Sequence, residues 1–312
     1  MVQKEIGGYF GLELNSKYNN IGNFIALNSA RNCLRYIIKA YAIKEIFVPY
    51  YTCPVVYEAI KKEHCKINFY HVDNNFMPIG NFNKEDFVLY TNYFGICAKN
   101  IEVLAKKYKN LIVDNAQAFY MSKYSLASFN SIRKFFGVTD GALLYCNKNL
   151  KKQIKQSISY NKFSHLLKRL DIDASFGYKN FRKNSEILAK EQIMYMSNLT
   201  KSIFNSIDIE RAKKIRLKNF KFLHKQLSRI NNLKIKLDKK DIPMIYPYLV
   251  KNGDKLRAKL IKNKIYIAQY WSAINNNLLN NNEKKIIKNL VAIPIDQRYS
   301  LDDMKRIIEV IV

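Results

Sequence analysis

The sequence contains no long hydrophobic run. No stretch of about 18 apolar residues occurs among its 312 residues, so no segment is expected to span a membrane. The first residues carry acids early and lack the apolar core of a signal peptide. We therefore expect a protein of the cytoplasm.

Cysteine and histidine are scarce and scattered. The five cysteines include no C-x-x-C pair, and the four histidines form no group with ligand spacing. Both observations argue against a zinc site, and we predict no metal. Reduced cysteines within apolar segments also suit a reducing cytoplasm.

Acidic residues are few, because 25 Asp and Glu stand against 53 Lys and Arg, a net charge of +28. A basic chain can bind nucleic acid. Here the lysines are spread along the chain beside many asparagines, a bias typical of an AT-rich genome. The most basic segments, 148–169 and 211–225, carry few regularly spaced aromatic residues on which bases could stack. We expect no nucleic-acid partner. Genome bias is the first interpretation of the charge, and attraction of a phosphorylated or nucleotide-linked substrate is the second.

The first half of the chain alternates helix and strand signals, which predicts an α/β fold with a mixed, mostly parallel sheet between helices. Helices are predicted at 29–41, 54–62 and 101–108, and strands at 45–48, 67–72, 87–91 and 111–113. Ligands of such sheets bind beyond the carboxyl ends of the strands. Asp114 and the segment after Val48 should therefore lie at the binding edge.

The second half of the chain shows a different pattern of predicted helices and strands. Two long amphipathic helices are predicted at 185–206 and 208–230, strands at 244–250 and 265–268, and helices at 283–290 and 301–311. This pattern predicts a large domain over residues 1–185 and a smaller α+β domain over 186–312.

Two residues of the predicted large domain suggest a cofactor. Asp114 ends an apolar strand, and Lys134 follows in a short polar turn. A carboxylate on a pyridinium nitrogen and a lysine that forms a Schiff base together suit pyridoxal 5'-phosphate (PLP). Taken singly, Asp114 could merely cap a turn and Lys134 is one of dozens of lysines.

A phosphate could bind where the first strong helix begins. Asn28 or Ser29 is its expected N-cap, and the free N–H groups of the first turn point toward any anion placed before it. Ser131, three residues before Lys134, could also donate a hydrogen bond to a phosphate. An ordinary N-cap remains the alternative.

These segments, in this order, resemble the DegT/DnrJ/EryC1/StrS family of PLP-dependent sugar aminotransferases, which have the fold-type-I architecture. The similar segments are S-A-R at 29–31, V-P-Y-Y-T at 48–52, V-D-N-A-Q-A at 113–118, S-I-R-K at 131–134 and G-V-T-D-G-A at 137–142. Arg216 and Asn219 resemble the family's R-x-x-N helix, and P-I-D-Q-R-Y-S near the end resembles its C-terminus.

The resemblance implies a role for each matched residue. Lys134 would bind the cofactor and shuttle the proton, Asp114 would pair with the pyridinium nitrogen, and Gln117 would reach the ring hydroxyl. The phosphate would be held by Ser29, Ala30, Arg31 and Ser131.

The resemblance also implies a homodimer. At the position where the family usually has a ring-stacking aromatic residue this chain has Cys53. Its thiol can pack on the cofactor ring but stacks less well, so Tyr51 or Tyr93 is the alternative source of a ring surface.

The leading hypothesis is a PLP-dependent aminotransferase that transfers an amino group from glutamate to a keto-sugar nucleotide in surface polysaccharide biosynthesis. The first alternative is PLP chemistry on a smaller phosphorylated ketone, or the dehydration of a sugar. The second is a non-catalytic protein with this fold, against which the presence of both Lys134 and Asp114 argues.

Overall fold

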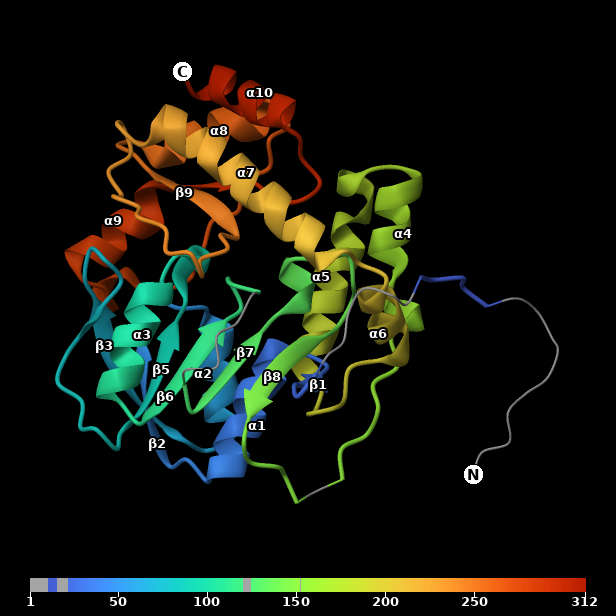
Figure 1. Ribbon diagram of the computed structural model, residues 1–312, viewed down its shortest axis with the longest axis vertical. Helices are drawn as coiled ribbons and strands as arrows, with labels where there is room; N and C mark the ends of the chain where they lie inside the picture. The colour runs from blue at the N-terminus through green and yellow to red at the C-terminus, as the bar shows by residue number, and fades with distance from the viewer. Residues whose placement is uncertain (1–10, 16–21, 120–124, 152) are drawn as a thin grey trace.

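The structure is a computed structural model, and it describes residues 11–15, 22–119, 125–151 and 153–312. Figure 1 shows a large sheet with helices packed around it, and a smaller sheet with its own helices lying above one end of the large sheet. Helices α4 and α5 stand together at one side.

The large sheet has the strand order β1-β8-β7-β6-β5-β2-β3-β4. Neighbouring strands from β7 to β3 run parallel, whereas β8, β1 and β4 each pair antiparallel. The predicted mixed, mostly parallel sheet is thus confirmed. Its strands are β1 Ile25–Leu27, β2 Glu45–Pro49, β3 Lys66–Val72, β4 Pro78–Ile79, β5 Phe87–Thr91, β6 Asn110–Asn115, β7 Ala127–Asn130 and β8 Ala142–Cys146.

Helices cover both faces of this sheet. Helices α1 (Ala30–Tyr41) and α2 (Pro54–Lys61) pack together on one face, and α3 (Ala98–Lys107) lies on the other. Strand β6 serves both cores by alternation, since Ile112 belongs to the α1–α2 core while Leu111 and Val113 belong to the α3 core.

The helices and strands predicted before residue 115 all occur, with ends that differ from the prediction by at most three residues. Ser29, rather than Asn28, is the N-cap of α1, because its hydroxyl accepts from Asn32 N. Asn28 is instead buried and donates to Glu191 and to the Gln192 carbonyl.

The single helix predicted at 185–206 is wrong. The structure has α4 Ser164–Asp171, α5 Ala174–Lys190 and α6 Asn198–Asn205, with extended chain between α5 and α6. That connection lies beside β1, where Asn28 N donates to Met194 O and Met196 N donates to Ala26 O. Pairing with a sheet edge outweighs the helical pattern there, and Ser197 then caps α6.

The smaller sheet pairs β9 (Ile245–Leu249) antiparallel with β10 (Leu290–Pro294). The strand predicted at 265–268 is wrong, because only Ala268 forms a bridge, to Ala292. Ile265 N instead donates to Leu260 O and closes the end of α8. The helices of this part are α7 Ile209–Leu227, α8 Gly253–Lys262, α9 Asn281–Asn289 and α10 Leu301–Ile311.

Short 3-10 helices complete the elements, at Tyr93–Gly95, Ile132–Lys134, Tyr160–Lys162 and Asn276–Leu278. The domain boundary at residue 185 stays a prediction, and that residue lies inside α5. None of the helices in the described ranges is long and apolar enough to cross a membrane.

Buried polar contacts join the two sheets. Glu283 of α9 is fully buried, and its carboxylate accepts from Val72 N at 3.0 Å and lies 2.8 Å from His71 Nδ1 of β3. Asp241 accepts from Ala98 N, the first residue of α3. These contacts hold the C-terminal part over the edge of the large sheet where the strands end.

Candidate active site

One cavity at the carboxyl ends of the strands gathers the residues that the sequence analysis assigned to the cofactor, apart from Tyr51 and Tyr93. Its volume is about 310 Å³. The predicted residues that line it are Ser29, Ala30, Arg31, Cys53, Asp114, Gln117, Ser131 and Lys134. Their individual roles stay predictions, but the structure brings them together from four separate stretches of the chain.

Asp114 lies at the end of β6. The alternation of this strand directs Asp114 to the same face as Ile112, toward α1 and α2. Its Oδ1 accepts from Ala116 N at 2.7 Å. Burial raises the pKa of Asp114, while the charge of Lys134 and the Ala116 N–H lower it.

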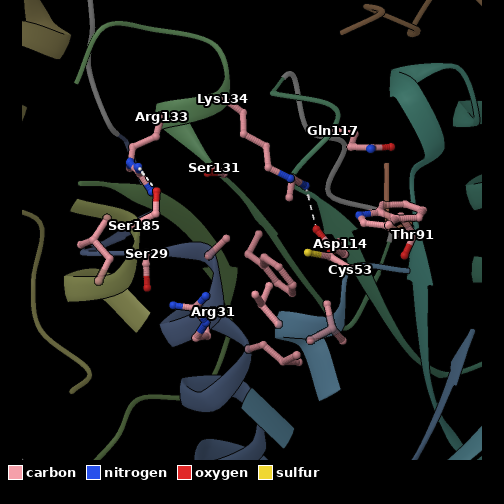
Figure 2. Close-up of a pocket in the computed structure, with 18 of the residues that line it drawn as sticks. Ser29, Arg31, Cys53, Thr91, Asp114, Gln117, Ser131, Arg133, Lys134 and Ser185 are labelled. Atoms are coloured by element: carbon pink, nitrogen blue, oxygen red, sulfur yellow. Dashed lines mark hydrogen bonds between the residues drawn. The ribbon is translucent and has the colours of Figure 1, made fainter. Parts of the chain in front are cut away.

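Lys134 ends the short helix Ile132–Lys134 and is exposed, which leaves its amine accessible. Figure 2 shows its side chain extending toward Asp114, while that of Arg133 extends the opposite way, toward Ser185. The consecutive side chains of Arg133 and Lys134 thus extend toward opposite ends of the cavity (Figure 2).

Asp140 fixes the loop that carries Lys134. It is fully buried and outside the cavity, and its carboxylate accepts from Ser197 N at 3.0 Å, from Ser197 Oγ at 2.9 Å and from Thr200 Oγ1. Gly141 has φ +111°, and a Cβ there would lie 3.1 Å from Thr200 Cγ2. The D-G-A segment therefore docks the loop against α6.

The end of the cavity opposite Asp114 is cationic. Arg31 and Arg133 both line it, and Arg133 donates to Ser185 Oγ at 3.2 Å. Burial lowers the pKa of Arg133 to about 10. The negative charge of Asp140 raises this pKa in part, and the positive charge of Arg31 lowers it further. The Nε atoms of both arginines are buried and have no hydrogen-bond partner among the described residues.

Gln117 offers a donor near the acidic end. Its Oε1 accepts from Phe94 N at 2.9 Å, which leaves Nε2 buried and without a partner in the described part of the chain. Nearby, the Thr91 hydroxyl lies 2.9 Å from that of Thr52, and Thr91 pairs with Asp114 in the register of β5 and β6.

This arrangement fits PLP. A carboxylate at one end suits a protonated ring nitrogen, and two arginines with the N-terminus of α1 suit a phosphate dianion at the other. Lys134 lies between them, within reach of Asp114. The unpartnered donors of Arg31, Arg133 and Gln117 are those that a bound anion or hydroxyl would satisfy.

No three side chains of His, Cys, Asp or Glu come together as metal ligands in the ranges that the structure describes.

The expectation for the ring surface is wrong. Tyr51 and Tyr93 are fully buried, stack on each other at 5.5 Å between ring centroids, and do not line the cavity. Tyr93 donates its hydroxyl to Tyr51 O, so both rings belong to the core beneath the site.

Sequence reasoning also missed Arg133, Ser185 and Trp271, which line the cavity. The position of Arg133 beside Lys134 was a signal that could have been used. Ser185 and Trp271 come from distant helices and loops, and no local pattern marks them.

Solved structures share this fold. A DegT/DnrJ/EryC1/StrS aminotransferase from Brucella abortus matches with a TM-score of 0.62 and 14% identity, over 92% of this chain and 84% of its own. The ntda protein of Bacillus subtilis, with bound cofactor PMP, matches with a TM-score of 0.65 and 15% identity, over 92% and 72%. A GDP-4-keto-6-deoxy-D-mannose-3-dehydratase of E. coli, with bound hydrated PLP, matches with a TM-score of 0.64 and 12% identity, over 93% and 87%.

No protein-family model matches the sequence, and no curated protein matches it. The likeness to solved structures therefore concerns the fold. The chain has the fold-type-I architecture of these enzymes, and the resemblance found in the sequence is confirmed at that level.

Asp114 should make the cofactor-free protein less stable at neutral pH. Because its pKa is raised in the folded state, ionisation opposes folding, and the stability present at low pH is lost as the pH rises through that pKa. We expect Asp114→Asn to raise the melting temperature of the apo protein at pH 7, by an amount that shrinks as the pH falls through the raised pKa and vanishes below the ordinary carboxyl value of about 4. Calorimetry over this pH range checks it, and a lower melting temperature at pH 7 would contradict it.

Proposed function

We propose that this protein is a PLP-dependent aminotransferase that moves an amino group from glutamate to a keto-sugar nucleotide. The observation that carries the proposal is the position of Lys134 between a buried carboxylate, Asp114, and the cationic end of the same cavity. The fold shared with a DegT/DnrJ/EryC1/StrS aminotransferase and with a dehydratase of a keto-sugar nucleotide supports the substrate class. We also propose, from the resemblance found in the sequence, that the protein acts in surface polysaccharide biosynthesis in the cytoplasm.

When bound, PLP supplies an aldehyde and an electron-withdrawing ring, the chemistry needed to transfer an amino group. The chain's residues would divide the remaining work. Asp114 would hold a proton on the ring nitrogen, since a buried carboxylate is stabilised by an adjacent positive charge. Lys134 would anchor the ligand and carry a proton at Nζ, and its exposed position allows the movement that this requires.

The cationic end would orient the ligand. Arg31 and Arg133 would bind the phosphate with charge-assisted hydrogen bonds, together with Ser29, Ser131 and the first N–H groups of α1. At the other end, the free Nε2 of Gln117 would donate to the ring oxygen.

Glutamate alone tests the reaction. When L-glutamate is added to the protein loaded with PLP, we expect the visible absorption of the bound cofactor to disappear and stoichiometric 2-oxoglutarate to appear. Lys134→Ala should show neither change and keep a folded far-ultraviolet spectrum. A parent protein that ignores glutamate but removes water from a keto-sugar nucleotide would favour the dehydration alternative, which the E. coli dehydratase with the same fold makes the main competitor.

Arg31 should contribute to the binding of PLP through the phosphate group of the ligand. Its side chain lines the cavity and does not point outward along the helix, and its Nε is buried. Arg31→Ala should weaken PLP binding by roughly 1.5–3 kcal/mol, the size of a hydrogen bond to a charged group. Pyridoxal, which lacks the phosphate, serves as the control ligand and should bind the variant and the parent alike. Equal losses for both ligands would refute a phosphate contact.

We also propose a homodimer. Helices α4 and α5 pack against each other and expose several large apolar side chains on the outside of the pair. They are Leu167, Leu170, Ile172, Phe176 and Tyr178. The middle of α5 also lines the cavity, through Phe181 and Ser185, so a partner bound there would lie next to the site.

Light scattering at micromolar concentration should therefore give the mass of two chains. Leu170, which is 83% exposed, is the most accessible member of the apolar set, and Leu170→Asp should shift the protein toward one chain. Ile261→Asp, on the exposed face of α8, is the matched control and should leave the mass unchanged. A parent protein that scatters as one chain would overturn the dimer.

A further inference from the structure

The only tryptophan of the chain lines the cavity. Trp271 belongs to a loop of the C-terminal part that starts after Ala268, which bridges to Ala292 of β10. The loop closes on itself where Ile274 N donates to Trp271 O at 3.1 Å. A side chain from a loop of the C-terminal part thus reaches into a cavity built mainly around the large sheet.

Ring contacts place Trp271 at the acidic end. Its indole lies edge-on to Tyr51 at 4.7 Å between ring centroids, and 6.0 Å from Tyr93. These tyrosines follow β2 and β5, and β5 ends at Thr91, the register partner of Asp114. The indole therefore rests on the buried tyrosine pair, beside the strand ends that carry Thr91 and Asp114.

The backbone of Trp271 is held in an unusual conformation. Its φ of +60° lies in the left-handed region, which a bulky residue rarely adopts. Strained residues of this kind persist where surrounding contacts fix them, and they concentrate at ligand-binding positions. Here the contacts with Tyr51 and Tyr93 fix the indole, and its partial exposure leaves surface open to the cavity.

Among the described residues that line the cavity, the other aromatic side chains offer little ring surface at the acidic end. Phe129 is the register partner of Asp114 in β7, but it is only 2% exposed and packs in the α1–α2 core. Phe181 lies at the cationic end, with its ring 5.7 Å from the guanidinium of Arg133. Cys53 and Ala116 offer no ring. Trp271 is thus the aromatic side chain available at the end where a pyridine ring would meet Asp114.

We propose that Trp271 is a positioning residue that packs its indole against the ring of bound PLP, so that the cofactor connects the C-terminal part to the large sheet. This inference rests on the proposed function. An electron-rich indole attracts an electron-poor, protonated pyridine ring through stacking and cation–π forces. Trp271 and Asp114 would therefore favour the same protonated form of the ring from different sides.

Titration of the parent protein and of variants with PLP tests the proposal, read by visible absorption and circular dichroism of the bound cofactor. Trp271→Ala should weaken PLP binding roughly three- to tenfold and reduce the induced dichroism, and Trp271→Phe should restore most of both. In the parent, the emission of the single tryptophan should be quenched by PLP with the dissociation constant that absorption gives.

Two further variants separate ring contact from loop structure. Trp271→Gly suits the positive φ and should fold well, yet it should bind PLP as weakly as Trp271→Ala. Tyr266→Ala removes a ring of the segment that leads into this loop, which is 61% exposed and does not line the cavity, and this variant should bind PLP like the parent.

Parental affinity and dichroism in Trp271→Gly, or an equal loss in Tyr266→Ala, would overturn the role of Trp271 while leaving the proposed function intact. Failure of the parent to bind PLP at all would overturn the proposed function, and this inference with it.

Discussion

The attraction between a buried carboxylate and a positive charge above it is the constraint on which the site depends. Asp114 is only 5% exposed, and burial opposes its ionisation. Lys134 and the Ala116 N–H compensate in part. A cationic ring nitrogen would complete that compensation, because an ionised group in a low-dielectric site is most stable beside an opposite charge. The cavity is thus built for a ligand that is positive at one end.

The fold sets the distance between that end and the other. Parallel strands bring Asp114 and Thr91 to one edge of the sheet. The N-terminus of helix α1 opens onto the cavity at the same edge. Arg31 and Arg133 add charge there, at the cost of mutual repulsion that a dianion would relieve. The loop that carries Lys134 is anchored by Asp140. It places Lys134 toward the acidic end of the cavity and Arg133 at the cationic end (Figure 2).

Much of this could be predicted from the sequence where the signal is local. Strand and helix periodicity located the elements before residue 115, and an acid at a strand end with a lysine in a polar turn located the cavity. The predictions failed where contacts between residues far apart in the sequence determine the local structure. The chain after α5 is extended because it pairs beside β1, and Tyr51 and Tyr93 are buried against each other. Ser185 and Trp271 reach the cavity only through the tertiary fold, so no spacing in the sequence could reveal them.

The most direct measurement is the identity of the lysine that holds the cofactor. Borohydride reduction of the protein mixed with PLP, followed by peptide mapping, should place the label on Lys134 and on none of the other lysines. The reaction depends on the amine that lies in the cavity with Asp114, and therefore on the geometry from which the function is inferred. A label on another lysine, or the absence of bound PLP, would contradict the assignment of this cavity as the active site.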